Sequence, residues 1–359
     1  MRRAVGEGLP VVVKVGSSSL VGQNGGLRGE AVERVATMVA RLWRRGHPAI
    51  LVTSAAVAAG FPALGLTERP QDLTGLQVAA AVGQGRLMQA YTDAFGHSDL
   101  VVGQVLLTRD VFADRSQYLH AGNALRRLLS AGVVPVVNEN DTVAVEGLKM
   151  GDNDRLAAMV SHLAGAGMLV ILTDTDGLFD SDPTLADAAL LEAVKHNDAI
   201  LDELSGVGRF GSGGVGTKVM AARMAAWSGV PTVIAKSTDE NIIDDAIDGK
   251  PVGTWVEPME EGLPARKLWI AFGKTPHGRI SIDEGAVRAL VRDGRSLLAV
   301  GVTDVHGDFE TGDVVDVDDH TGSVVARGLA SMSSATLEAV YGQRGRGEAI
   351  HRDHMVVLG

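Results

Sequence analysis

A lysine lies inside an apolar run near the start of the chain. Lys14 interrupts Val11–Val15, and Gly16 and the hydroxyls of Ser17 to Ser19 follow it. A cation is costly inside a sheet unless an anion meets it, and open α/β sheets bind ligands at the carboxyl ends of their strands. Lys14 is therefore a candidate phosphate ligand, and an edge lysine that extends to solvent is the plain structural alternative.

Further polar segments could bind an anion and an amino acid. Ser54 follows a second apolar run and opens a small-residue turn into a helix, where N–H groups favour an anion. Acidic and amide residues at 138–142 and 152–155 could hold an ammonium group and orient lysines. Each segment also has a structural reading, because Ser54, Asp152 or Asn153 could simply cap a helix.

A glycine-rich segment at 211–218 ends in Thr217-Lys218. It is close to a Walker A loop, but Thr217 precedes Lys218 where that motif needs the lysine first, and no apolar strand leads into it. The overlapping GxGxxG pattern at 206–211 lacks the same strand. What remains is a flexible loop whose N–H groups can surround phosphates, with a lysine at a helix N-terminus.

Other catalytic classes find little support. Four aspartates between 174 and 182 lack the full calcium-loop pattern, so a turn is expected there. The ten histidines show no HExxH pairing, and no Ser–His–Asp arrangement is visible, which disfavours a zinc enzyme or a hydrolase. The chain has no cysteine, which excludes disulfides, thiolate zinc sites and a cysteine nucleophile.

Length and composition predict a soluble globular protein of two domains, with 359 residues, 45% hydrophobic and 21% charged. No apolar stretch reaches the length of a transmembrane helix. The net charge of −11 argues against nonspecific binding to nucleic acid. It does not argue against a nucleotide held by a few local cations.

The elements that must position these residues form a layered pattern in the first two thirds of the chain. Apolar strand runs alternate with helices, which predicts an α/β/α fold on a mostly parallel sheet covered on both faces. We expect strands at 11–15, 49–53, 100–107, 133–137, 168–173 and 232–235. We expect helices at 28–45, 75–94, 117–129, 154–163 and 218–227.

A charged segment with two prolines after Glu257 predicts a linker at 258–266. The segments beyond it are shorter. Turn signals at 283–285, 306–308, 311–313 and 320–322 separate strand candidates at 297–302, 314–317 and 323–327. Closely spaced short strands predict a small β-rich domain at 267–359.

Taken in order, the segments resemble the amino acid kinase family, and whole phrases resemble its members that phosphorylate glutamate. The phrases are VVKVGSSSL, VTSAAVAAG, VGQVLLT, PVVNENDTV, GDNDRLAA, LTDTDGLFDSDP and GSGGVGTK. The segment from Trp269, with ISIDEGAVRAL and AIHRDHMVVL, is similar to the C-terminal PUA domain of many members.

The resemblance implies a catalytic domain at 1–257 that converts L-glutamate and ATP to L-glutamyl 5-phosphate, the first step of proline biosynthesis. It implies Lys14, Asp152 and Lys218 as catalytic residues, with Asp152 holding the two lysines. Glutamate binding is implied for Ser54, Ala55, Asp141 and Asn153. ATP binding is implied for Lys14, Gly16, Ser17, Thr173, Asp174, Ser212, Gly213, Gly214, Val215, Gly216, Thr217 and Lys218. Mg²⁺ would be carried on the nucleotide phosphates, without a protein metal site.

The resemblance also implies a cytoplasmic homo-oligomer whose product a glutamyl phosphate reductase consumes, with proline as a feedback inhibitor acting through 142–150. The alternatives are another carboxylate kinase of this fold, an RNA-binding protein, or a regulatory relative with weak activity. RNA is disfavoured because residues 267–359 hold 10 Lys plus Arg against 13 Asp plus Glu.

Three positions depart from the family pattern. Ala55 replaces the usual glycine after the substrate serine, His120 and Gly122 alter the phrase at 118–123, and Val215 replaces a common methionine. Because Ala56 to Ala59 start a helix well, we expect Ala55 to be benign, with an ordinary negative φ.

Overall fold

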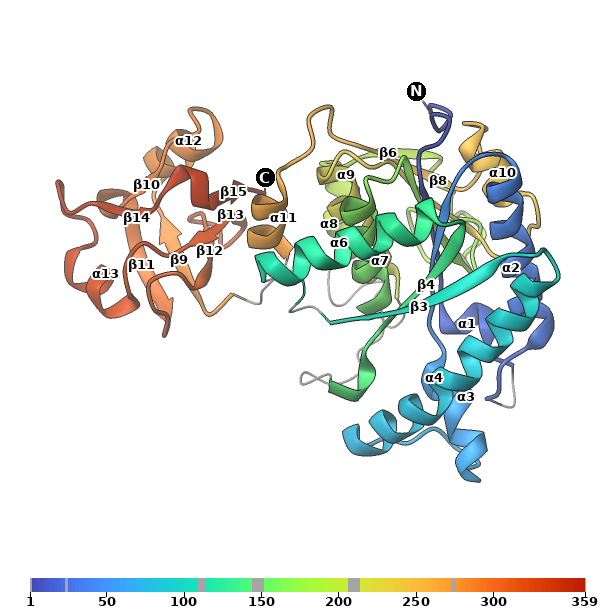
Figure 1. Cartoon of the computed structure of the whole chain (residues 1–359). Helices are drawn as coiled ribbons and strands as arrows, with labels where there is room; N and C mark the ends of the chain where they lie inside the picture. The colour runs from blue at the N-terminus through green and yellow to red at the C-terminus, as the bar shows by residue number, and fades with distance from the viewer. Residues whose placement is uncertain are drawn as a thin grey trace. The chain divides into compact units, whose positions relative to one another are not determined.

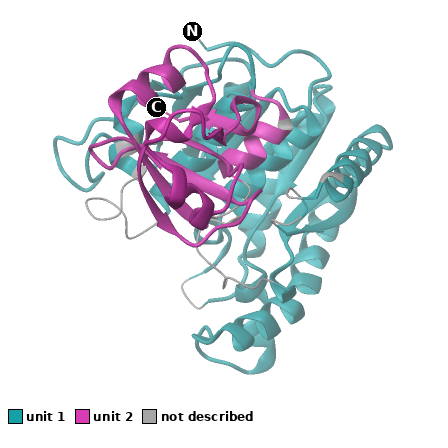
Figure 2. Cartoon of the chain, turned by 90° about the vertical axis from the view of Figure 1, so that its left-hand side faces the viewer, with its two compact units in different colours: residues 1–262 teal, residues 263–359 magenta. Residues whose placement is uncertain are grey.

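The computed structural model describes residues 2–22, 25–108, 111, 114–143, 152–205, 214–272 and 276–358. The chain divides into two compact units, residues 1–262 and 263–359, which Figure 2 colours separately. The boundary lies inside the segment where the sequence places a linker. Among the described residues, no helix is both long and apolar enough to cross a membrane.

Unit 1 is built on an eight-stranded sheet of order β3-β4-β2-β1-β5-β7-β8-β6. Neighbouring strands are parallel except β7 and β8. The strands are β1 (Val11–Val15), β2 (Ala49–Val52), β3 (Val101–Leu107), β4 (Val133–Glu139), β5 (Met168–Thr173), β6 (Ala193–Lys195), β7 (Thr232–Lys236) and β8 (Thr254–Glu257). This confirms the predicted fold class, a layered domain on a mostly parallel sheet.

Helices cover the sheet on two sides (Figure 1). One layer contains α2 (Gly29–Arg44), α4 (Leu73–Gly96) and α10 (Ile242–Ile247), with α2 in contact with both others. The other contains α6 (Arg115–Ser130), α7 (Asp152–Ala164), α8 (Ala199–Ser205) and α9 (Val215–Trp227), in which α7 packs on α6 and α9, and α8 packs on α9. The short helices α1 (Ser17–Leu20) and α3 (Ala56–Gly60) follow β1 and β2, and 3₁₀ turns lie at Phe61–Leu64 and Asp141–Val143.

Strand β1 shows how alternation positions the site. Its residues Val11, Val13 and Val15 belong to the core cluster that includes α2. Successive side chains of a strand point to opposite faces, so Val12 and Lys14 face the layer of α7, which contacts β1. Lys14 is thereby directed to the helices that carry the acidic and glycine-rich segments.

Unit 2 contains a five-stranded sheet of order β11-β9-β12-β13-β15 and a two-stranded pair, β10 and β14. Its strands are β9 (Gly278–Ile282), β10 (Leu297–Leu298), β11 (Val302–Gly307), β12 (Val314–Asp318), β13 (Val324–Leu329), β14 (Glu348–Ile350) and β15 (Met355–Val357). Its helices are α11 (Ala265–Phe272), α12 (Glu284–Val291) and α13 (Ser334–Val340), with 3₁₀ turns at Ala299–Gly301 and Arg352–His354. The predicted β-rich character is confirmed.

Two local predictions in unit 2 are wrong. The turn expected at 283–285 is the start of α12, because the Asp283 side chain accepts from the Ala286 N–H and caps the helix. The strand expected at 297–302 is interrupted by the 3₁₀ turn at Ala299–Gly301. The sequence Asp-Glu-Gly is compatible with both a turn and a helix start, and the apolar residues that follow it determine which one forms.

Candidate active site

A buried ion pair joins the first strand to α7. Lys14 is 4% exposed and Asp154 is 1% exposed, with 2.5 Å between the lysine Nζ and the carboxylate Oδ1. The alternative of an edge lysine reaching solvent is therefore contradicted. Asp154 lies in the first turn of α7, on the face turned toward β1.

Helix α9 brings a second lysine to the same carboxylate. The Nζ of Lys218 lies 3.9 Å from Asp154 Oδ2, and the Thr217 hydroxyl donates to that oxygen over 2.8 Å. Lys218 also donates to the Gly214 carbonyl at 3.0 Å. Gly214 itself has a positive φ of 61°. Burial lowers the pKa of Lys218, Asp154 opposes the shift, and Lys14 adds to it.

The cluster brings two lysines to one buried carboxylate, that of Asp154, and Asp174 also acts on Lys218. A buried cation is costly unless an anion meets it, and electrostatic attraction is strongest where water is excluded. The cluster fits a phosphoryl group.

Asp154 was missed by the sequence reasoning, which gave the organising role to Asp152. Asp152 is the first residue of α7, and its side chain lies outside the described residues. The signal that could have found Asp154 is helical spacing, because Asp154, Ala157, Ala158 and Ser161 are all buried and recur at one-turn intervals. A carboxylate on a buried stripe requires a cation.

Nucleotide-side candidates lie at the ends of β1 and β5 and at the start of α9. Thr173 ends β5, is 4% exposed and donates to Asp174 Oδ1 over 3.0 Å. Asp174 contributes to the electrostatics of Lys218. Gly16 directly follows β1, and an added Cβ at this position would lie 3.2 Å from Lys14 Nζ. Ser17 begins α1.

The glycine segment is only partly described. Gly214 is the N-cap of α9, and Val215, Gly216, Thr217 and Lys218 form its first turn. Ser212 and Gly213 lie outside the described residues. Their predicted contacts with a nucleotide stay predictions.

A second polar group gathers where β2, β4 and α7 meet. The Asn153 Nδ2 donates to Ser54 Oγ at 3.1 Å and to Asn138 Oδ1 at 3.0 Å. Asn138 is 1% exposed and also bonds to Gln84 on α4. The structure thus brings Ser54 and Asn153 together, while Asp141 starts the 3₁₀ turn just after β4.

Ala55 has a positive φ of 81°, in the left-handed region. The expectation of an ordinary negative φ is wrong, because helix propensity at 56–59 says nothing about the residue that turns the chain into the helix. The turn is held by its neighbours: Thr53 is fully buried and its hydroxyl lies 2.8 Å from Tyr91 Oη. An L-residue in this region costs about 1 kcal/mol, which the surrounding contacts must offset.

The aspartates at 174–182 form turn contacts and one ion pair to the end of β7. Asp176 pairs with Lys236 at 3.1 Å, and Asp180 accepts from the Ala189 N–H at 2.9 Å. The Ala189 N–H, followed by the Ser181 hydroxyl, lowers the pKa of Asp180. Within the described part of the chain, no cluster of three or more His, Asp or Glu side chains could hold a metal ion.

Comparison with known proteins decides the family. The model of the amino acid kinase family matches residues 10–236, and that of the PUA domain matches 278–353. The chain belongs to the amino acid kinase family. As a member, it is 43% identical over 362 aligned positions to Glutamate 5-kinase of Caldanaerobacter subterraneus subsp. tengcongensis, covering 97% of each chain. It is 44% identical to Glutamate 5-kinase of Cutibacterium acnes, covering 99% of this chain and 93% of the other.

Solved structures agree on the fold of this amino acid kinase. Carbamate kinase from Giardia lamblia bound to AMP-PNP superimposes with a TM-score of 0.52 at 19% identity. It covers 70% of this chain and 99% of its own length. At that identity the likeness concerns the fold alone.

Proposed function

We propose that the chain is a glutamate 5-kinase, which transfers the γ-phosphoryl group of ATP to the γ-carboxylate of L-glutamate in the first step of proline biosynthesis. The observation that carries the proposal is the pair of lysines, Lys14 and Lys218, held on the buried Asp154. Full-length similarity to Glutamate 5-kinases supports the choice of acceptor. No comparable observation favours another carboxylate kinase or an RNA-binding protein.

The reaction needs cations at the phosphates and does not need a general base. The substrate carboxylate is ionised at neutral pH, so its oxygen can attack the γ-phosphorus directly while the bond to the β-phosphate oxygen breaks and ADP leaves. No proton has to move. Catalysis then depends on alignment and on stabilising the charge of the transferring group.

The residue roles follow from the two polar groups. Lys14 and Lys218 would bind the phosphates and stabilise the transferring group, and Asp154 would set their spacing. Gly16, Ser17, Thr173, Asp174 and the start of α9 would contact the nucleotide. Ser54, Ala55, Asp141 and Asn153 would bind glutamate.

The Ser54 hydroxyl is well prepared for a carboxylate. Its oxygen already accepts a hydrogen bond from Asn153, so its hydrogen is available to donate. Mg²⁺ would neutralise phosphate charge while carried on the nucleotide. A cytoplasmic homo-oligomer, coupling to a glutamyl phosphate reductase, and proline inhibition through 142–150 complete the proposal.

A hydroxylamine trap tests the proposal, because acyl phosphates react to form hydroxamates. Purified protein with ATP and Mg²⁺ should form hydroxamate with L-glutamate and much less with L-aspartate or N-acetyl-L-glutamate. A preference for either of the other two acceptors, or no hydroxamate with any, would contradict it.

A further inference from the structure

Gln84 lies beside the polar group formed by Ser54, Asn138 and Asn153. It belongs to the helix layer of α2, α4 and α10, whereas Asn153 belongs to the layer of α7. Gln84 is on α4, and its Oε1 accepts from Asn138 Nδ2 over 2.9 Å. Asn138 in turn bonds to Asn153, which contacts Ser54. Four side chains therefore form one chain of hydrogen bonds from α4 to the proposed glutamate ligands.

A backbone donor sets the direction of this chain. The Glu139 N–H donates to Asn138 Oδ1 at 2.9 Å and to Asn153 Oδ1 at 3.2 Å. A backbone N–H can only donate, so an oxygen of each amide must face it. The nitrogen of Asn138 therefore has to point away from Glu139, toward Gln84.

Asn138 depends on Gln84 for its remaining bond. The Asn138 side chain is 1% exposed, so bulk water cannot readily accept from its nitrogen. A buried amide N–H without an acceptor is costly, and a flipped Asn138 amide would place its nitrogen against the Glu139 N–H. The Gln84 oxygen accepts from the Asn138 nitrogen, so this buried nitrogen is not left without an acceptor. The same bond makes a flipped Asn138 amide unfavourable.

The backbone of α4 is fixed close to the same turn. An added Cβ at Gly83 would lie 1.8 Å from the Ala56 carbonyl, and one at Gly60 would lie 1.8 Å from the Ala79 carbonyl. Helices α3 and α4 therefore touch through their backbones next to Ser54 and Ala55. This contact sets how far the Gln84 side chain reaches.

Gln84 is not an obvious stabilising residue. Its Nε2 is buried and has no hydrogen-bond partner among the described residues. An unpaired buried donor lowers stability, so a side chain serving packing alone would be better apolar. The polar atom of Gln84 that forms a hydrogen bond is Oε1, which accepts from Asn138.

We propose that Gln84 is a positioning residue for the amino acid substrate, whose side-chain oxygen fixes the Asn138 amide and so aims Asn153 and Ser54 at glutamate. This inference rests on the proposed glutamate kinase function. It assigns Gln84 no contact with the reacting atoms.

The test is Gln84→Met, which keeps the length and removes both polar atoms. The KM for glutamate should rise about tenfold, equivalent to about 1.4 kcal/mol. The KM for ATP and the unfolding temperature should change little, because one unpaired donor disappears as another is created. Gln89→Met is the matched control on the same helix: Gln89 is exposed and bonds only to Asp93 in the described structure, so this variant should behave as wild type.

A double-mutant cycle with Asn153→Ala separates positioning from a general structural effect. If Gln84 acts through Asn153, Gln84→Met should raise the KM less than twofold further in the Asn153→Ala background. Equal factors in the two backgrounds, or an unchanged KM in Gln84→Met, would overturn the inference.

Gln84→Glu keeps an acceptor oxygen for Asn138 and covers the case in which the methionine variant does not fold. Its KM for glutamate should stay within about threefold of wild type. A tenfold rise would count against the proposal. Wild-type protein without glutamate kinase activity would refute the proposed function itself, whereas an active wild type with an unaffected Gln84→Met refutes only the role of Gln84.

Discussion

Asp154 occupies a buried position on an otherwise small and apolar stripe of α7. Lys14 could be identified from the sequence because a lysine inside a strand is conspicuous, and Lys218 because it ends a glycine segment. The carboxylate between them was missed, because Asp152 and Asp154 stand in the same phrase. Only the helical spacing of Asp154 with the small buried residues Ala157, Ala158 and Ser161 distinguishes the two aspartates.

The hydrogen bond of Gln84 and the positive φ of Ala55 were also not predicted from the sequence. Gln84 lies within a correctly predicted helix, but its partner Asn138 is 54 residues away in sequence. Ala55 was judged by helix propensity, whereas its φ is set by the tertiary contacts of the turn. Local composition predicts neither a hydrogen bond between residues far apart in sequence nor a strained dihedral angle.

Ala55→Gly should stabilise the protein. Glycine adopts a φ of 81° without the Cβ penalty, so we expect a gain of about 1 kcal/mol and a rise of about 2–4 °C in the unfolding temperature. Ala58→Gly, in the helical part of α3, is the matched control and should lower stability. Calorimetry checks both.

An unchanged or lower unfolding temperature in Ala55→Gly would mean that the turn does not strain alanine. The same variants should be assayed for kcat/KM with glutamate. A gain of tenfold or more would show that the methyl group also obstructs the substrate.

Strands that are continuous apolar runs were readable from the sequence, and strands without such a run were not. The apolar runs behind β1, β2 and β5 are completely buried, and the predicted ranges match their bounds within one residue. The strands β6 (AVK) and β8 (TWVE) were missed because polar residues leave neither of them a continuous apolar run.

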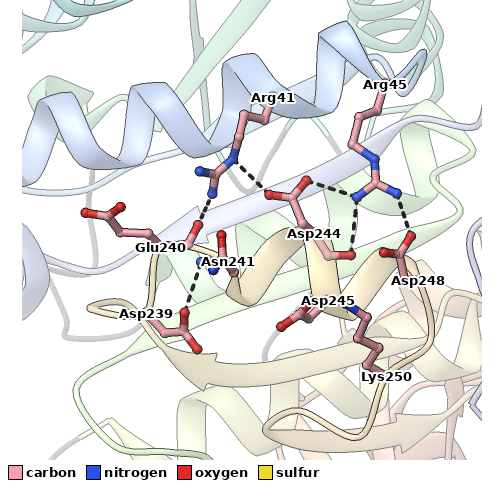
Figure 3. Close-up of polar contacts among 9 residues, drawn as sticks. All are labelled: Arg41, Arg45, Asp239, Glu240, Asn241, Asp244, Asp245, Asp248 and Lys250. Atoms are coloured by element: carbon pink, nitrogen blue, oxygen red, sulfur yellow. Dashed lines mark hydrogen bonds and ion pairs between the residues drawn. The ribbon is translucent and has the colours of Figure 1, made fainter.

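A surface ion-pair network ties α2 to α10 (Figure 3). Asp244 forms an ion pair with Arg41, with 2.8 Å between Oδ2 and Nε, and its Oδ1 accepts from Arg45 at 3.0 Å. Arg45 also donates to Asp248 at 2.5 Å. The hydrogen bonds that Arg45 donates to Asp248 and then to Asp244 raise the pKa of Arg45. One carboxylate shared by two arginines from another helix makes Asp244 the centre of the network.

Asp244→Asn should lower stability by up to about 1 kcal/mol, because exposed pairs contribute little even when several combine. The loss should shrink in 1 M salt, where charges are screened within about 3 Å. Asp245→Asn on the same helix, whose partner Lys250 comes from the following turn, is the control and should change less. A loss independent of salt would show that packing, not charge, holds the two helices.

At the scale of the whole molecule, every described residue of the candidate site lies in unit 1. The end of that unit is anchored to α9, since the Met259 N–H donates to the Ala226 carbonyl at 2.9 Å and Gly262 packs against Ser228. A chain ending at Pro264 keeps these contacts. It should fold and still form glutamyl hydroxamate in the trapping assay.

Circular dichroism and gel filtration would establish that the truncated chain is folded before its activity is judged. A folded, soluble truncation without activity would show that residues 265–359 complete the site.

We propose that the charge of Lys218, held on Asp154 beside Lys14, acts on the transferring phosphoryl group. The most direct measurement is the steady-state kinetics of Lys218→Ala in the hydroxylamine assay, with the exposed Lys250→Ala as control. We expect kcat to fall about 100-fold or more, with a KM for glutamate within about threefold of wild type, because the charge is needed chiefly in the transition state. An unchanged kcat would contradict it.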